Sequence, residues 1–338
     1  MFCLVIARIH LDMVSYTQWV RKLLLACCLL GGAVQAAPIH DIGELKPQAM
    51  WTLGKTADWV AVGADAVWVA STGPFAVHRI DPATQAVTNH VPLTGEPCSG
   101  LALGFGYLWV PLCASKDAKH AAALAKVDLT TRKVIARYPV GPAAPEGGIA
   151  VSDDSVWLVI DAHGSLARID PNTGTIRART QIPAGSHNPH FNQGVVWISQ
   201  ATGSILSGVN ADNGTLLPPI AVGPQPRFLT SGAGAVWTLN QGDGSVTRVD
   251  LATKGTQSIA LHTPGPGGDL QYGGGYLWST MPKTPLSLID ADTHALICQW
   301  RGPGGDSLGI GFGAIWLTDY HGGTVSRIPI ENALASCR

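Results

Sequence analysis

The sequence predicts an all-β fold, a seven-bladed β-propeller of four-stranded antiparallel blades. The first supporting observation is that an apolar residue followed by tryptophan recurs seven times, with gaps of 41, 48, 40, 40, 41 and 38 residues between the tryptophans. A near-constant period of about 40 residues is typical of repeat architectures. The second is that each unit contains four short β-rich runs separated by turn-forming residues. The recurring tryptophans are Trp68, Trp109, Trp157, Trp197, Trp237, Trp278 and Trp316.

The third unit illustrates the four predicted strands. They lie at residues 148–151, at 155–159 around Trp157, at 168–170, and at 175–182. The third strand ends in Asp170, as the same strand does in most other units, and an Asp there can accept backbone N–H bonds within the following turn. We therefore predict that these Asp residues form turns. We expect the tryptophans to be buried packing residues, because an aromatic ring buries a large area.

The two ends of the chain predict how the ring closes. The last unit has strands around Trp316 and at residues 324–328, but little room for a fourth. Residues 50–54 resemble the fourth strands of other units. We predict that this N-terminal segment completes the last blade, which removes an exposed sheet edge.

Residues 1–36 are expected to be a cleaved signal peptide. Arg21 and Lys22 precede an apolar run and a small-residue cleavage site that ends at Ala36. A membrane anchor is the alternative, but the run is shorter than the about 20 apolar residues that a spanning helix needs. Met1 and Met13 both remain candidate start sites. The mature chain, 37–338, is then one periplasmic or secreted domain without a transmembrane segment.

Charge and cysteine content narrow the function classes. Without Arg8, Arg21, Lys22 and Asp12 the mature chain keeps 19 basic and 22 acidic side chains, a formal charge of −3. The mature chain therefore lacks the basic stripe that nucleic-acid-binding proteins carry. The protein is also expected to be a monomer.

Four cysteines remain in the mature chain, and an even number favours disulfides in an exported protein. Cys98 and Cys113 face each other if a hairpin turns at Phe105-Gly106. Cys298–Cys337 then follows by elimination, and this second pairing stays open.

Counting from each tryptophan places a set of varied side chains at one end of the propeller axis. The loops between blades, and those between second and third strands, lie on the same face, and ligands favour such concave mouths. The predicted ligand-binding residues there are Asp58, Trp59, Glu146, His187, Arg227, Phe228, Asp269 and Asp306. The carboxylates could perturb one another or bind a cation, and Arg227 could clamp a carboxylate. The alternative is a ring of solvated charges.

Three residues are candidates for catalysis. His190 could act as a general base or metal ligand. Asp319 and His321 follow a tryptophan strand, and alternation would place them on one side with Tyr320 facing away. Ordinary loop residues are the alternative for all three.

The pattern G-x-x-P…I-A-x-G-x-G-A-V-W-V…R-I-D-P-x-T-G resembles the YVTN-type bacterial propellers and the seven-bladed streptogramin (virginiamycin B) lyases, over roughly residues 45–330. The lyase resemblance implies a Mg²⁺ ion held near a Pro-His element, which Pro189-His190 matches. Asn188 precedes it where the family has Glu, and Gln200 and Asn240 stand where carboxylates are expected.

Three functions follow as hypotheses. The first is binding of a small molecule, peptide or partner protein at the axial mouth. The second is a lyase or hydrolase, dependent on Mg²⁺ or another divalent cation, at the same mouth. The third is an envelope assembly role without a pocket. An enzyme should gather His190 or His321 with two or more carboxylates within metal-ligand distance at one end of the channel. A binding module should instead show aromatic or mixed polar walls, such as Trp59 and Phe228, without that constellation.

Overall fold

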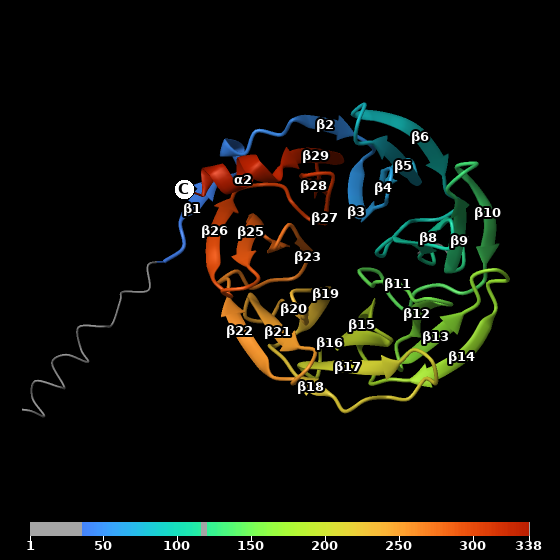
Figure 1. Cartoon of the computed structure of the whole chain (residues 1–338). Helices are drawn as coiled ribbons and strands as arrows, with labels where there is room; N and C mark the ends of the chain where they lie inside the picture. Colours follow the sequence, from blue (N-terminus) through green and yellow to red (C-terminus); the bar gives the residue numbers. More distant parts are fainter. Residues whose placement is uncertain (1–35, 116–119, 338) are drawn as a thin grey trace, which may run out of the picture. The chain divides into compact units, whose positions relative to one another are not determined.

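The computed structural model describes residues 36–115 and 120–337. These residues form seven sheets, and in residues 38–337 the sheets are arranged radially as the blades of a β-propeller (Figure 1). The predicted signal peptide, except Ala36, lies outside the described residues. No helix in the described ranges is long and apolar enough to cross a membrane.

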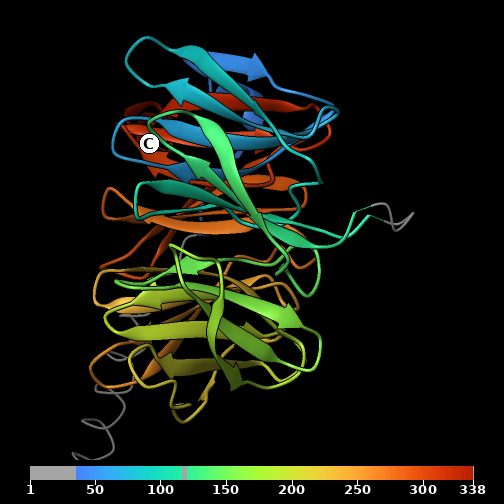
Figure 2. The ribbon, with the colours of Figure 1, turned by 90° about the vertical axis from the view of Figure 1, so that its right-hand side faces the viewer.

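Each blade contains four antiparallel strands, of which the first lies nearest the axis (Figure 1). Figure 2 shows the same sheets from the side. The first three blades contain β3 Thr56–Val62, β4 Val67–Thr72, β5 Ala76–Asp81 and β6 Ala86–Pro92; β7 Ala102–Gly104, β8 Tyr107–Leu112, β9 Ala123–Asp128 and β10 Lys133–Tyr138; and β11 Ala150–Val151, β12 Val156–Asp161, β13 Ser165–Ile169 and β14 Ile176–Gln181. The fourth and fifth contain β15 Ser186–Asn192, β16 Val195–Gln200, β17 Ile205–Asn210 and β18 Ile220–Ala221; and β19 Pro226–Gly232, β20 Ala235–Asn240, β21 Ser245–Asp250 and β22 Thr256–Ala260. The sixth and seventh contain β23 Asp269–Gly273, β24 Tyr276–Met281, β25 Thr284–Asp290, β26 Leu296–Arg301 and β1 Ile39–Asp41; and β27 Leu308–Gly311, β28 Ala314–Asp319, β29 Thr324–Pro329 and β2 Ala49–Thr52.

The predicted closure is confirmed. Strand β2 pairs antiparallel with β29, with Trp51 opposite Val325, and so supplies the fourth strand of the last blade. The sequence did not predict β1, which pairs parallel with β26 as a fifth strand of the sixth blade. It also missed the 3-10 helix η1 (Ile42–Glu44) and the helix α2 (Ile330–Ser336). Seven residues are too few for α2 to show helical periodicity.

Tryptophan packing and Asp turns follow the predictions. Each of the seven repeated tryptophans is at most 2 % exposed. Asp170 Oδ1 accepts the backbone N–H of Asn172 at 2.7 Å and of Thr173 at 2.9 Å. These N–H groups, together with the Arg177 guanidinium, lower the pKa of Asp170 to about 2. Asp170 is thus a turn former.

A glycine closes the first strand in four blades, and it sets the spacing between neighbouring blades. In the fifth blade, a Cβ atom on Gly232 would lie 2.1 Å from the Tyr272 ring of the sixth blade. The Gly232 carbonyl accepts a bond from Trp237 Nε1 at 3.0 Å. The same arrangement recurs at Gly104, Gly273 and Gly311. Each such glycine therefore joins its own tryptophan strand to the next blade.

Two disulfides form among the described residues: Cys98–Cys113, as predicted, and Cys298–Cys337, the pairing that the sequence left open. The expected pairing register around the first one is wrong. The hairpin does turn at Phe105-Gly106, with Leu103 opposite Leu108, but Pro97 bridges to Leu112. The cysteines therefore do not face each other directly. The regular pairing of this hairpin begins only at Ala102, where β7 starts, and Pro97 forms an isolated bridge before it. Likewise β11 starts at Ala150, two residues after the predicted start.

Trp51 allows the ring closure to be tested. Its indole stacks on Trp316 at 5.8 Å between ring centroids, whereas Met50, its neighbour on β2, is 61 % exposed. We expect Trp51→Ala to lower the free energy of unfolding by about 2 to 3 kcal/mol, because a partly buried aromatic is lost from a packed face. Urea unfolding measures the change. Met50→Ala is the control, and an equal effect of both substitutions would contradict the role of this strand in closure.

Candidate functional site

The predicted mouth residues lie where the innermost strands begin, and β-bulges project several of them from the ladder. Pairing between β3 and β4 slips between Asp58 and Val60, which leaves Trp59 unpaired with a left-handed φ of 55°. Pairing of β19 with β20 slips between Pro226 and Leu229 and releases Arg227 and Phe228. Bulges are frequent where a strand must re-aim a side chain.

Trp59 and Phe228 meet although they come from the first and fifth blades. Their ring centroids are 6.4 Å apart with an interplanar angle of 45°, and they are 6 % and 5 % exposed. We call this pair the aromatic partition. Trp59 lines two cavities. Asp58 and Glu146 line the mouth cavity of about 110 Å³, and the deeper residues Val60 and Leu229 line the channel cavity of about 170 Å³.

Three carboxylates, Asp58, Glu146 and Asp306, lie close enough at the mouth to affect one another. We call them the mouth carboxylates. Burial, then the charges of Asp306 and Glu146, raises the pKa of Asp58 well above its usual value, although the Ser307 hydroxyl and the Trp59 backbone N–H donate to it. Burial and Asp306 raise the pKa of Glu146 to about 6, although the charge of Arg227 acts in the opposite direction. Burial also raises the pKa of Asp306. Within the described ranges none of the three forms an ion pair.

Arg227 binds backbone and does not pair with a mouth carboxylate. Its Nε donates to the Glu146 carbonyl at 3.1 Å, and one terminal nitrogen donates to the Glu146 and Pro145 carbonyls at 2.8 and 3.3 Å. The Asn188 amide in turn donates to the Arg227 carbonyl at 2.7 Å. Arg227 thus links the segment before the first strand of the third blade to the start of the first strand of the fifth blade. Burial and the Arg227 charge lower the pKa of His187 to about 4, so its imidazole is neutral.

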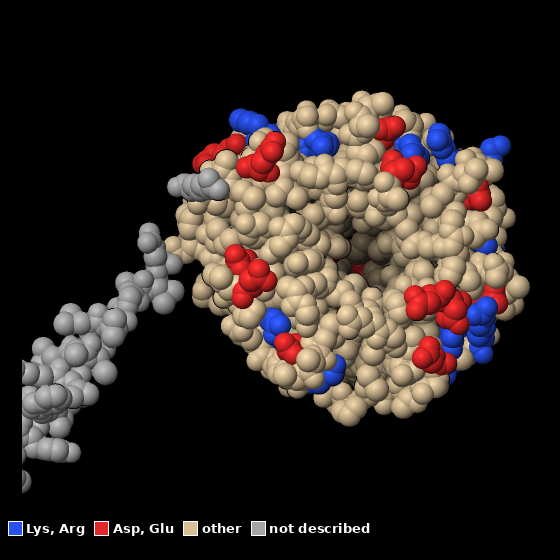
Figure 3. All heavy atoms as spheres, viewed as in Figure 1, with Lys and Arg blue, Asp and Glu red and all other residues tan. Residues whose placement is uncertain are grey.

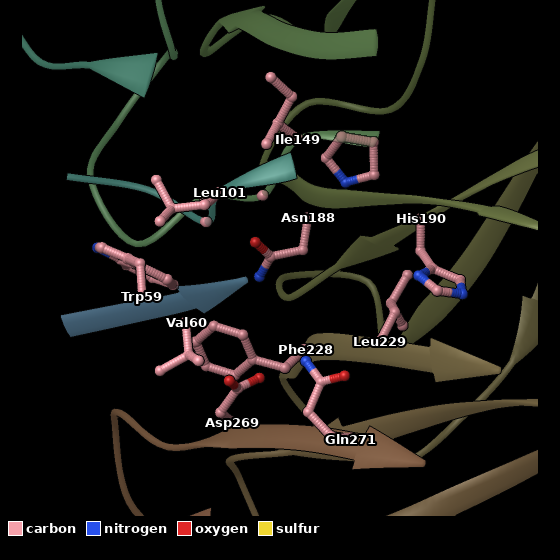
Figure 4. A pocket seen from close by; sticks show the side chains of 14 residues that line it. Trp59, Val60, Leu101, Ile149, Asn188, His190, Phe228, Leu229, Asp269 and Gln271 are labelled. Atoms are coloured by element: carbon pink, nitrogen blue, oxygen red, sulfur yellow. The ribbon is translucent and has the colours of Figure 1, made fainter. Parts of the chain in front are cut away.

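Asp269 and His190 lie in the channel cavity with Asn188 and Gln271 (Figure 4). Asp269 accepts the backbone N–H of Leu270 at 2.7 Å and of Leu308 at 3.1 Å, and burial raises its pKa to about 7. His190 Nε2 lies 2.9 Å from the Ser231 hydroxyl, and burial lowers its pKa to about 4.

The structure does not bring the three predicted catalytic residues together. Asp319 and His321 line an outer pocket of about 450 Å³ that Asp306 and Tyr320 share, whereas His190 lies in the channel cavity. The expectation that Tyr320 faces away from His321 is wrong, since their rings meet edge to face at 5.2 Å. Strand β28 ends at Asp319 and a turn follows, so strand alternation no longer applies. Asp319 Oδ1 accepts the Gly322 N–H at 3.0 Å within that turn.

The donor set for a Mg²⁺ ion of the lyase type does not fit. In residues 36–115 and 120–337, no three His, Cys, Asp or Glu side chains are grouped as metal ligands. The two amides at the corresponding strand exits already have structural partners. Gln200 donates to the Ala184 carbonyl at 2.9 Å, and the fully buried Asn240 donates to Ser245 and Thr247 at 2.9 and 2.8 Å.

A comparison with solved structures finds a β-propeller protein of similar fold. The crystal structure of BamB from Moraxella catarrhalis aligns with a TM-score of 0.56 and 13% sequence identity, over 78% of this chain and 81% of that chain. The chain shares the fold of BamB. At this identity the likeness shows the fold alone. A scan against protein-family models and a search of curated proteins found no match.

Several site residues were missed by counting to the blade entrances. Gln271 lines the channel cavity two positions after Asp269, and Glu96 and Ser71 line the mouth cavity. Extending the count by alternate strand positions would have found Gln271, because residues two apart share a face.

The raised pKa of Glu146 predicts a pH dependence of stability. The folded protein keeps this proton up to about pH 6, whereas the unfolded chain releases it near pH 4.5. The resulting stabilisation is present below about pH 4.5 and is lost as pH rises through 6. We expect Glu146→Gln to reduce this loss by about 1 to 2 kcal/mol. Urea unfolding between pH 4.5 and 7.5 measures it, with Glu331→Gln on α2 as control. An unchanged pH slope in Glu146→Gln would contradict the assignment.

Proposed function

We propose that the protein is an exported binding propeller whose mouth takes a small molecule or peptide through a cationic group. The observation that carries this is the convergence of the mouth carboxylates without a cationic side chain paired to them in the described ranges. Keeping like charges together in a buried site is costly. A bound ammonium or guanidinium group would favour the ionised carboxylates and offset their repulsion.

Aromatic side chains in the same region support a cationic ligand. Trp59 and Tyr320 line the mouth cavity, and Tyr320 also lines the outer pocket beside Asp306. A cation near an aromatic face gains electrostatic attraction from the ring. Burial, followed by the charges of Asp58 and Glu146, raises the pKa of Tyr320, which shows that its phenol lies within the field of these acids. The mouth therefore combines negative charge with aromatic surface.

Two disulfides in the described residues support export to an oxidising compartment, periplasmic or extracellular. Membership of the YVTN-type propellers, a monomeric state and the absence of a nucleic-acid partner are part of the same proposal. The lyase or hydrolase alternative would need His190 or His321 with two or more carboxylates within metal-ligand distance. No such group occurs among residues 36–115 and 120–337, which favours binding.

A matched pair of ligands tests the proposal. Nα-acetyl-lysine amide carries a free ε-amine, and Nα,Nε-diacetyl-lysine amide differs by the loss of that charge. We expect calorimetry to show binding of the first compound alone. Its affinity should rise at least about tenfold from pH 5 to pH 8, because Glu146, whose pKa is raised to about 6, loses its proton over this range.

The substitution that accompanies this test is Asp306→Asn, which removes one mouth charge. We expect it to weaken binding of the cationic probe by about tenfold, with Glu331→Gln as the matched surface control. Equal binding of the charged and acetylated probes, or affinity independent of pH, would contradict the proposal.

A further inference from the structure

The channel cavity is distinct from the mouth. Of the residues that line the two cavities, Trp59 alone is common to both. The cavity volume of about 170 Å³ is more than ten times the space that one water needs and below the about 300 to 1,000 Å³ of sites for drug-sized ligands. It therefore suits a small metabolite.

Part of the wall is bare backbone. Gly100, Gly147 and Gly148 line the cavity just before the short first strands β7 and β11. Gly100 N donates to the Gly147 carbonyl at 2.9 Å, so these two segments bind each other across the second and third blades. A first strand is also a sheet edge, and alternate backbone groups on such an edge face away from the ladder. Donors and acceptors of the main chain are thus accessible to a ligand.

Side chains from the fourth and sixth blades add further hydrogen-bonding groups. Asn188 is 5 % exposed, its Nδ2 is held by the Arg227 carbonyl, and its Oδ1 has no partner in the described part of the chain. Each carboxylate oxygen of Asp269 accepts one backbone N–H and keeps a second lone pair for a ligand. Figure 4 shows Asn188, Asp269 and Gln271 around one space, with Phe228 and Trp59 beside it.

The composition of this wall disfavours anions and purely apolar ligands. No Lys or Arg lines the cavity, so an anion would face Asp269 without a counter-charge. A purely apolar ligand would leave Asn188 Oδ1 and the Asp269 carboxylate without partners, which is costly in a buried site. Figure 3 shows the axis hollowed on the face in view, with Lys, Arg, Asp and Glu lying mainly toward the periphery and not around the opening.

We propose that the channel cavity binds a small neutral polyhydroxylated molecule of monosaccharide size. Its hydroxyl groups would bond to Asn188, Asp269 and Gln271, and its C–H face would pack on the aromatic partition. This site is separate from the cationic site at the mouth.

Calorimetry on the purified protein tests the proposal with D-glucose, D-mannose and myo-inositol as probes and cyclohexanol as the control ring. We expect at least one polyol to bind with a Kd in the millimolar range or below, and cyclohexanol to show no binding. Gln271→Leu preserves side-chain size and removes the amide, and should weaken binding at least about tenfold. Leu101→Trp should abolish it by filling the cavity.

Glu331→Gln on α2 is the matched surface control and should leave polyol affinity unchanged within about twofold. Circular dichroism and thermal unfolding confirm that each variant is folded. Failure of all three polyols to bind, equal binding of cyclohexanol, or full affinity in a folded Gln271→Leu variant would overturn the proposal. The Gln271→Leu variant should still bind the cationic probe. This shows that its loss of polyol binding arises in the channel cavity and that the two proposals are tested independently.

Discussion

The structure depends on the close approach of neighbouring blades at the end of each first strand. Where a glycine stands there, as at Gly232, a side chain of the next blade occupies the space that a Cβ atom would need. The carbonyl of that glycine also receives the tryptophan N–H of its own blade. Packing between blades and hydrogen bonding within a blade are therefore satisfied at one residue. Because the ring is closed by β2, a change in this spacing in one blade affects the circumference.

This spacing holds the first strands around a narrow axis, and residues at their start meet across it. Trp59 and Phe228 are in contact although 169 positions separate them in the numbering of the chain. Arg227 reaches the carbonyl of Glu146 across the entrance of the fourth blade. The mouth thus combines bulged residues, such as Trp59 and Arg227, with Glu146 and Asp306, which lie in the segments between blades. The side chains that differ in chemistry between blades lie at the start of the first strands, whereas the residues that build the blades repeat.

The fold could be predicted from the sequence because its determinants repeat. A period of about 40 residues, an Asp at the end of the third strand and a spare N-terminal strand are all visible in one chain. The residues of the mouth could be listed for the same reason, by counting from each tryptophan. Their contacts could not, since the bulge at Trp59 and the bond from Arg227 to a backbone carbonyl depend on three-dimensional placement. His190 illustrates the limit: its sequence position was right for an axial residue, but its depth in the channel cavity was not readable from spacing.

Trp59 has one consequence that follows from its position between the two cavities. Its indole ring is a wall of both, and its backbone is held in a left-handed bulge next to Asp58. An occupant that moves this ring on one side changes the shape available on the other. Occupancy of the mouth and of the channel is then thermodynamically linked, and the coupling free energy is the same in either direction. The aromatic pair that closes the axis would also act as the means by which one cavity responds to the other.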